Sequence, residues 1–364
     1  MNNEFTLRLQ KIEGVLNTYL PFVSNADWLS LSFGNIDSCV NDLHLADLIV
    51  PCKSLLDLGG KRWRPLLLVL CAELVARSKK LSELEFETAL KKAYNLTPLV
   101  EFSHTASLIH DDIEDAADTR RGKPCAHITY GLDVALNAGS WLIFEAAACI
   151  PRLDASDSEK KSLYELYLTE LRRLHLGQAM DILWHRNPKM IPSIEEYRTM
   201  VRNKTGTLAR LAVKLGVLAG GGSMAQVEKA GQIAQDIGTG FQIIDDVINL
   251  TTGNPGKKRG DDIVEGKKSL PVLLHLQKNP SDREKLASLF ERARSQGIDS
   301  PAVEEAICLL TESGAVDEAK KKGKEIILEN SQALVSLFAE EGEKESSSVA
   351  LLITELFDAL QKKA

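Results

Sequence analysis

The sequence predicts an all-α protein, a single domain of long helices over residues 1–364. Three observations lead to this prediction. Apolar residues recur at helical spacing along nearly the whole chain, and alternating β-branched runs bounded by turns are scarce. No Ser- or Pro-rich linker and no change in composition marks a domain boundary. A content of 44% hydrophobic and 26% charged residues is ordinary for a globular protein.

The helices follow from runs of apolar periodicity separated by turn-forming residues. They are expected at about 65–78, 82–112, 133–150, 158–185, 194–219, 224–251, 268–277, 282–295, 303–313, 315–340 and 346–362. Breaks are expected at glycine- and proline-containing turns, at 59–60, 122–124, 187–188, 220–222 and 254–256. Glycine-rich turns between long helices are where binding residues can gather.

Charge, cysteine spacing and hydropathy exclude several classes of protein. The net charge of -7 argues against a nucleic-acid-binding surface. The six cysteines are scattered without a CxxC pair, which indicates reduced thiols. The amphipathic first fifteen residues are not typical of a signal peptide, and the longest apolar runs, such as 65–76, are expected to be too short for a membrane span. We therefore expect a soluble, cytoplasmic protein without stable membrane insertion.

An acidic cluster stands out at 108–118, where Asp111, Asp112 and Asp115 accompany Glu114 and Asp118. Carboxylates three or four residues apart share a helix face and repel one another. Most charge runs are solvated faces. This run, however, follows an apolar segment and is followed by two adjacent arginines, so we expect a binding site that includes a positive charge.

A second acidic pair, Asp245 and Asp246, ends another apolar segment, with Asn249 one turn later. An ionised carboxylate on an apolar helix face is costly unless it is paired or bound to metal. Oxygen ligands without nearby His or Cys suit Mg²⁺, which typically bridges to substrate phosphates. The two pairs together predict a Mg²⁺-bound phosphate ester or diphosphate.

Basic residues next to glycine recur in five segments, at 59–65, 120–124, 204–210, 256–262 and 265–271. Glycine lets the backbone approach a ligand closely. Arg binds phosphate through two parallel hydrogen bonds from its guanidinium group, and Lys binds it through a single compact charge. None of these segments matches a P-loop or a dinucleotide fingerprint, so a nucleotide enzyme is not supported.

In this order, GGKRWRP (59–65), DDIED (111–115) with RRG (120–122), GQAMDILW (177–184), KTGTL (204–208), FQIIDD (241–246) and EGKKSLP (265–271) resemble the trans-isoprenyl diphosphate synthases, or polyprenyl synthetases. The resemblance runs from about Leu55 to the C-terminus. It implies the isoprenoid synthase type of helix bundle around a central cavity.

The resemblance also implies a reaction. A polyprenyl diphosphate synthase condenses isopentenyl diphosphate with an allylic diphosphate, whose Mg²⁺-assisted ionisation gives a carbocation, and the product is a linear polyprenyl diphosphate. Catalysis is then mainly electrostatic stabilisation and positioning. This prenyltransferase chemistry needs no protein nucleophile.

Roles follow from the matching motif positions. The resemblance implies that Asp111 and Asp115 are metal ligands supported by Asp112, with Asp245 on the opposite wall and Asp246 nearby. The isopentenyl diphosphate pocket is implied to contain Lys61, Arg64, His104 and Arg121. The allylic diphosphate is implied to contact Arg120, Lys204, Lys267 and either Lys257 or Lys258, with Thr205 and Gln242 beside the reacting carbon.

The chain departs from the family pattern at several positions. Asn249 stands where the family usually has a third Asp, Ser140 stands where relatives often have Asp, and Ser269 replaces Thr. None of these changes removes a principal metal ligand, so activity is expected.

Product length is expected to depend on the small residues before Asp111, which are Ser103, Ala106 and Ser107. In similar enzymes, Phe or Tyr four or five residues before the first Asp stops growth at short products. Their absence here predicts a product longer than twenty carbons, unless Trp141 or Phe144 of a facing helix blocks the tunnel.

The family resemblance also implies a homodimer, and the apolar helix 133–150 is a candidate for its interface. The alternative is that this helix is ordinary core.

Two other readings remain open. A class I terpene cyclase shares the fold and the first acidic motif, but it handles one diphosphate and does not need the isopentenyl pocket. A non-catalytic subunit of a heteromeric synthase is the second reading, although such subunits tend to lose the acidic motifs that are present here.

Overall fold

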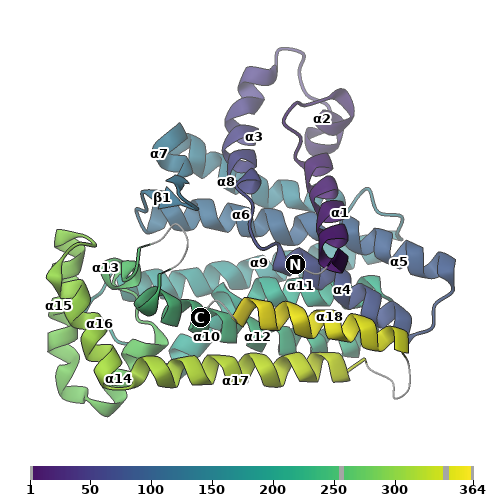
Figure 1. The fold of residues 1–364 in the computed structure, drawn as a ribbon. Coiled ribbons are helices and arrows are strands. Elements are labelled where there is room, and N and C mark those ends of the chain that lie inside the picture. The colour runs from purple at the N-terminus through teal and green to yellow at the C-terminus, as the bar shows by residue number, and fades with distance from the viewer. Residues whose placement is uncertain (1–2, 254–257, 339–343, 362–364) are drawn as a thin grey trace. The chain divides into compact units, whose positions relative to one another are not determined.

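The computed structural model describes residues 3–253, 258–338 and 344–361, and these residues form an all-α fold apart from one short hairpin (Figure 1). The predicted fold class is therefore confirmed. The chain divides into two compact units. Unit 1 comprises Met1–Glu170, Leu211–Gly231 and Leu337–Ile353, and unit 2 comprises Leu171–Arg210, Gln232–Ser336 and Thr354–Ala364.

Unit 1 is built on the N-terminal helices (Figure 1). Its elements are α1 (Asn3–Tyr19), α2 (Ala26–Phe33), α3 (Asp42–Asp57), α4 (Trp63–Ser78), α5 (Glu83–Asn95), α6 (Thr97–Glu114), the strands β1 (Thr119–Arg120) and β2 (Lys123–Pro124), α7 (Ala126–Tyr130), α8 (Leu132–Ala146) and the 3₁₀ turn η1 (Ala147–Cys149). Helix α6 packs against α8, α4 and α1, so the first acidic motif lies at the end of a helix with several packing partners.

Unit 2 contains the second acidic motif and most of the C-terminal helices. Its elements are α10 (Ile194–Lys204), α13 (Asp261–Glu265), α14 (Leu270–Lys278), η2 (Pro280–Asp282), α15 (Arg283–Gln296), α16 (Pro301–Glu312) and α17 (Ala315–Ser336). Four helices have residues in both units, namely α9 (Asp157–His185), α11 (Gly206–Ala219), α12 (Met224–Thr251) and α18 (Lys344–Gln361).

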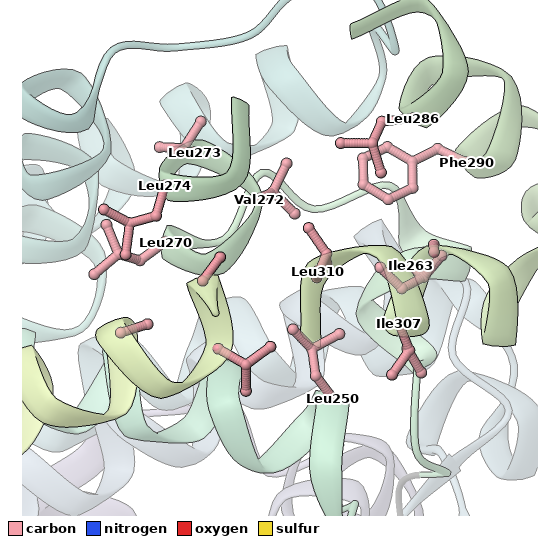
Figure 2. Packing of buried hydrophobic residues seen from close by; sticks show 14 of the residues in the cluster. Leu250, Ile263, Leu270, Val272, Leu273, Leu274, Leu286, Phe290, Ile307 and Leu310 are labelled. Atoms are coloured by element: carbon pink, nitrogen blue, oxygen red, sulfur yellow. The ribbon is translucent and has the colours of Figure 1, made fainter. Parts of the chain in front are cut away.

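A hydrophobic cluster holds the helices of unit 2 together (Figure 2). Leu270 and Val272 of α14 lie in one cluster with Ile307 and Leu310 of α16, and Phe290 of α15 is also part of it. These side chains are at most 3% exposed. Burial of a large apolar side chain stabilises the folded state by about 1.5–3 kcal/mol. The cluster should therefore hold the C-terminal helices, and the loop at 265–269 that precedes α14, in place.

Two predicted helices are each two helices in the structure. The segment 82–112 breaks at Leu96, and α6 restarts with Pro98 in its first turn, where the missing N–H of proline is tolerated. The segment 194–219 breaks at Thr205, and a Cβ on Gly206 would lie 2.7 Å from the Gln235 carbonyl oxygen. Both single-helix predictions were wrong at these positions because a proline and a close helix contact override the apolar period.

The N-terminal helices α1, α2 and α3 were not among the predicted elements. Helix α3 contains Pro51 in its interior, which weakens a helical reading of the sequence. Its start did carry a signal, because Asn41 and His44 form a reciprocal cap. Helix α13 is a single short segment between Gly260 and Gly266, both left-handed, and it is too short to show a period.

One segment of the described residues, Leu132–Cys149, is long and apolar enough to cross a membrane by length and composition alone. The core helices of soluble proteins pass the same test, and 39% of this segment is buried. The sequence-based expectation that every apolar run is too short does not hold for it.

Candidate active site

The first acidic motif lies at the C-terminal end of α6. Asp111 and Asp115 are partly exposed one turn apart, whereas Asp112 is 2% exposed. Asp112 accepts a hydrogen bond of 2.8 Å from Nε of Arg120, and Nη2 of Arg120 lies 3.7 Å from Asp111. Arg120 is therefore the positive charge that the clustered carboxylates require. Burial lowers the pKa of Arg120, but the hydrogen bond and charge of Asp112 outweigh it and raise that pKa above its ordinary value.

Arg120 and Arg121 are held by a tight hairpin. Thr119 pairs with Pro124 and Arg120 with Lys123, so Arg121 and Gly122 are the two turn residues. Both have positive φ, 53° and 75°, as a two-residue hairpin of type I′ requires. The RRG motif is therefore the turn itself, and it directs two successive arginines into different surroundings.

Arg121 lies against the glycine-rich loop before α4. Its Nη1 donates to the carbonyl oxygens of Gly59 and Leu55, the latter at 3.3 Å. A Cβ on Gly60 would lie 3.0 Å from Nη2 of Arg121, so glycine at this position makes room for the guanidinium. Lys61, exposed, follows directly in this loop.

Arg64 and His104 form the second half of this basic group. Nη1 of Arg64 lies 3.4 Å from Nε2 of His104, and the Arg64 guanidinium stacks over the ring of Trp63 at 4.6 Å. Unit 1 thus places Arg64 beside His104 and Arg121 beside the loop that carries Lys61. The four residues predicted for isopentenyl diphosphate thus belong to two groups within unit 1, Arg64 with His104 and Arg121 with the loop of Lys61.

His104 carries no positive charge at neutral pH. Burial, with Arg64 and Arg121 as the next causes, lowers the pKa of His104 well below its ordinary value. A neutral imidazole donates one hydrogen bond and accepts another. His104 is therefore suited to orient Arg64 or to donate to an anion, and not to act as a cation.

The second acidic motif lies near the end of α12 in unit 2. Asp245 is exposed, whereas Asp246 is buried and accepts hydrogen bonds from Tyr197 Oη at 2.7 Å and Gln242 Nε2 at 2.9 Å. Gln242 in turn accepts from Thr205 Oγ1 at 2.7 Å. Burial raises the pKa of Asp246 to about 6 against these hydrogen bonds. Thr205 and Gln242, both predicted to lie beside the reacting carbon, are therefore hydrogen-bonded to each other.

Lys204 is fixed by the residues around it. Its Nζ donates to the buried Asp181 at 2.6 Å. A Cβ on Gly177 would lie 2.2 Å from the Lys204 backbone nitrogen, so α9 and α10 touch at a glycine. Asp181 and Tyr197 are site residues that sequence reasoning did not single out as such. Asp181 belongs to the GQAMDILW motif, which is the sequence signal that could have identified it.

The remaining basic residues have separate environments. Lys267 forms an ion pair with Glu265. Lys258 is exposed and lies 3.7 Å from Asp299, and Lys257 lies outside the described residues.

Two departures from the family pattern have structural explanations. Asn249 is buried, and its Oδ1 accepts a hydrogen bond of 3.2 Å from the Asp262 backbone, so it holds the start of α13. Ser140 Oγ lies 3.3 Å from Nε2 of His110, whose ring also packs against Gly139. Each replacement therefore has a hydrogen-bonding role in the protein itself.

The small residues before Asp111 line the buried part of α6. Ala106 is fully buried, and Ser107 donates to the His104 carbonyl oxygen at 2.8 Å. Ser103 Oγ lies 2.9 Å from the Oη of Tyr167, which itself donates to the Ile143 carbonyl oxygen at 2.6 Å. An aromatic ring from α9 therefore adjoins this helix two turns before Asp111.

The donor set fits Mg²⁺ in kind. The accessible carboxylates Asp111, Asp115 and Asp245 are hard oxygen ligands, and Asp112 and Asp246 are taken up by hydrogen bonds from the protein. Within the parts of the chain that the structure describes, no three or more His, Cys, Asp or Glu side chains gather into a complete metal cage.

Comparisons with known proteins identify the class. The polyprenyl synthetase family model matches residues 46–307. A geranylgeranyl pyrophosphate synthase of Gibberella zeae is 34% identical over 260 residues, 71% of this chain and 67% of that protein. A geranylgeranyl diphosphate synthase of Methanosarcina mazei is 30% identical over 82% of this chain and 88% of its own length.

A solved structure supports the same fold. The crystal structure of geranylgeranyl pyrophosphate synthetase from Pyrococcus horikoshii Ot3 superposes with a TM-score of 0.76 at 26% identity, covering 98% of this chain and 97% of that one. The all-α fold and the two acidic motifs define an isoprenoid synthase type of enzyme. The chain belongs to the polyprenyl synthetase family and is a prenyltransferase.

Proposed function

We propose that this enzyme condenses isopentenyl diphosphate with an allylic diphosphate, with Mg²⁺ as cofactor, and releases a linear prenyl diphosphate. The observation that carries the proposal is the basic group of unit 1. Arg64 with His104, and Arg121 with the loop of Lys61, form a phosphate-binding set apart from the Arg120 that pairs with the acidic motif. A separate anion site is what a second diphosphate substrate requires.

The residues then divide between two diphosphates. Lys61, Arg64, His104 and Arg121 hold isopentenyl diphosphate, and Arg120, Lys204 and Lys267 bind the allylic diphosphate. Asp111, Asp115 and Asp245 would hold Mg²⁺, which would supply positive charge to offset that of the departing diphosphate. The buried Asp112 and Asp246 orient neighbouring groups. The hydrogen bond from Thr205 to Gln242 fixes a polar pair beside the reacting carbon.

Product analysis of the purified chain tests this function against its rivals. With an allylic diphosphate alone, a class I terpene cyclase releases a hydrocarbon or alcohol, whereas this enzyme is expected to wait for isopentenyl diphosphate. With both substrates it is expected to elongate. No turnover of the chain alone with both substrates would instead support a non-catalytic subunit.

Metal dependence and the division of the pocket form a second test. Chelator is expected to abolish turnover, and Asp111→Ala or Asp245→Ala is expected to lower kcat by about 10²–10³-fold. Arg64→Ala should raise KM for isopentenyl diphosphate, and Lys204→Ala should mainly impair the allylic substrate. Full activity in chelator would contradict the metal assignment, and equal effects on both substrates would contradict the division.

We propose a product of twenty carbons. The related proteins of Gibberella zeae and Methanosarcina mazei are named as geranylgeranyl synthases, and they do not support the longer product expected from Ala106 and Ser107. The buried Tyr167 beside Ser103 supplies a physical reason, because it fills space roughly 12 Å along α6 from Asp111.

Substitutions at this position test the product length. Tyr167→Ala should lengthen the product distribution, and Ala106→Phe should shorten it while the first condensation continues. Tyr167→Phe, which keeps the ring, is the matched control and should change the distribution little. Unchanged products in both Tyr167→Ala and Ala106→Phe would contradict this role of α6.

We also propose that the enzyme works as a cytoplasmic homodimer. The apolar residues exposed on α8 support the dimer and are discussed below. Fractionation of the cells that make the protein would test its location, and recovery with the membrane fraction after a salt wash would contradict it.

A further inference from the structure

Arg62, between Lys61 and Arg64 in the GGKRWRP motif, has no role in the site as described above. Its side chain is buried, with 5% of the residue exposed. Its backbone is left-handed, with φ of 44° and ψ of 28°, which is unfavourable for a residue with a Cβ. Four non-glycine residues of the described chain have positive φ, and Arg62 and Arg121 are two of them. Strained backbone at two neighbouring positions of one loop cluster indicates a constrained site.

Three parts of unit 1 hold the guanidinium of Arg62. Nη1 donates to Oε1 of Glu101 on α6 at 2.7 Å, and Nε donates to Oε1 of Glu13 on α1 at the same distance. Nη2 donates at 2.6 Å to the carbonyl oxygen of Leu56 at the end of α3. Arg62 thus joins α1, α3 and α6 at the residue that begins α4. A lysine, with one point charge, could not make these three directed hydrogen bonds.

One of the two carboxylates that hold Arg62 also acts on the basic pocket. Glu101 precedes His104 by one helical turn, and it interacts electrostatically with Arg62, Arg64 and Arg121. The charge of Arg62 in turn lowers the pKa of Arg121, after the larger effect of burial. Without Glu13 and Glu101, three arginines would repel one another at this loop.

Glu13 comes from a helix outside the residues that match the family model, which begin at 46. Helix α1 packs against both α4 and α6. The Glu13 side chain is 42% exposed, so its loss removes the ion pair without leaving a cavity.

We propose that Arg62 is a positioning residue for the isopentenyl diphosphate site, and that Glu13 of α1 is its partner in this role. The Arg62 fork fixes the loop so that Lys61 and Arg64 leave it toward His104 and Arg121. This assignment rests on the proposed function, because it concerns the same pocket.

Steady-state kinetics with each substrate varied in turn tests the proposal. Wild-type turnover with both substrates is measured first, and its absence would count against the proposed function and not against the role of Arg62. Glu13→Gln is expected to raise KM for isopentenyl diphosphate about three- to tenfold, with kcat and KM for the allylic substrate close to wild type. Arg62→Lys should raise the same KM further, by about ten- to a hundredfold.

Glu4→Gln is the matched control, because Glu4 lies on the same helix and pairs with Arg8 instead of Arg62. It should lower stability by as much as Glu13→Gln or less, and leave both KM values unchanged. The double variant Glu13→Gln with Arg62→Lys should show less than the product of the two single effects, since the pair acts as one unit.

Two results would overturn the proposal. One is a Glu13→Gln enzyme that melts at a lower temperature but keeps the wild-type KM for isopentenyl diphosphate. The other is an equal rise in KM for both substrates in Arg62→Lys, which would indicate general loosening of unit 1.

Discussion

The two acidic pairs show how unequal adjacent residues can be. In each pair the first carboxylate is accessible, and the second is buried and hydrogen-bonded to the protein, with Asp112 bound by Arg120 and Asp246 by Tyr197. On a helix, neighbours in sequence point about 100° apart, so one faces solvent and the other faces the packed interior. We expect the first member of each pair to bind the ligand and the second to hold the surrounding structure.

Glu145 on α8 is a buried carboxyl group whose contribution to stability should depend on pH. It is 3% exposed and accepts a hydrogen bond of 2.7 Å from Ser32, and burial raises its pKa to about 7. The folded pKa lies above the unfolded value, so the stabilising contribution is present at low pH and is lost as pH rises through about 7. Glu145→Gln should therefore raise the free energy of unfolding by about 1–3 kcal/mol at pH 8 and by much less at pH 5. Denaturant unfolding at both pH values measures this.

A carboxylate with the opposite shift serves as the control. Hydrogen bonds from Lys92 and Ser156 lower the pKa of Glu159 to about 2, so its contribution is present at neutral pH and is lost as pH falls below its unfolded value. Glu159→Gln should destabilise the protein at pH 8. If Glu145→Gln gave the same gain at pH 5 and pH 8, burial of the charge would not be its cause.

Sequence patterns predicted residue types well and environments poorly. The motifs assigned Thr205 and Gln242 to the same part of the site, and the structure joins these two residues by a hydrogen bond. The roles of Arg62, Glu101 and Asp181 could not be found in this way. Each role depends on a partner many residues away in sequence, and a single sequence does not show which distant residues are in contact.

At the scale of helices, periodicity located the long elements and missed their interruptions. Helix α12 was predicted at the same bounds, since its apolar stripe continues from Met224 to Thr251. The breaks at Leu96 and Thr205 arise from Pro98 and from the close approach at Gly206. A proline is visible in the sequence, whereas the helix that approaches a glycine is not.

Helices α9 and α10 come into close contact at Gly177. A Cβ there would lie 2.2 Å from the Lys204 nitrogen and 2.7 Å from the Asn203 carbonyl carbon, and both are backbone atoms that cannot turn aside. Gly177→Ala should therefore lower the free energy of unfolding by about 1–3 kcal/mol or more, the usual cost of overpacking. It should also raise KM for the allylic substrate, because Lys204 moves. Unfolding curves and kinetics measure the two effects.

Gly14 on α1 is the matched control for Gly177. A Cβ on Gly14 meets nothing within 4 Å, and the residue is exposed in a helix. Gly14→Ala should raise stability by about 0.5–1 kcal/mol through helix propensity alone. A Gly177→Ala protein that gained stability in the same way would show that α9 and α10 do not touch at this residue.

At the scale of the whole molecule, α8 presents two different faces. Ala135, Ala138 and Leu142 are fully buried, whereas Leu136 is 50% and Phe144 is 74% exposed. The alternatives of core helix and subunit contact thus apply to opposite sides of one helix. The exposed side also explains why Leu132–Cys149 is apolar enough to resemble a membrane span.

An exposed apolar stripe on an enzyme surface commonly marks an interface. We expect a symmetric dimer in which α8 of one copy meets α8 of the other, as a two-fold axis requires of one self-complementary patch. Leu136→Glu together with Phe144→Glu places like charges at this contact and should give a monomer. Sedimentation velocity at micromolar concentration measures the change from the wild-type dimer.

The control for the dimer is an equally exposed apolar residue elsewhere in unit 1. Leu43, at the start of α3, is 81% exposed, and Leu43→Glu should leave the dimer intact because this residue is not on α8. A wild-type monomer at micromolar concentration would contradict the homodimer. A dimer that survives both changes on α8 would locate the interface on another face.

The dimer contact is also expected to affect activity. The first acidic motif lies on α6, which packs directly against α8, so loss of the dimer should lower kcat. The activity of the monomeric variant tests whether the contact supports the site.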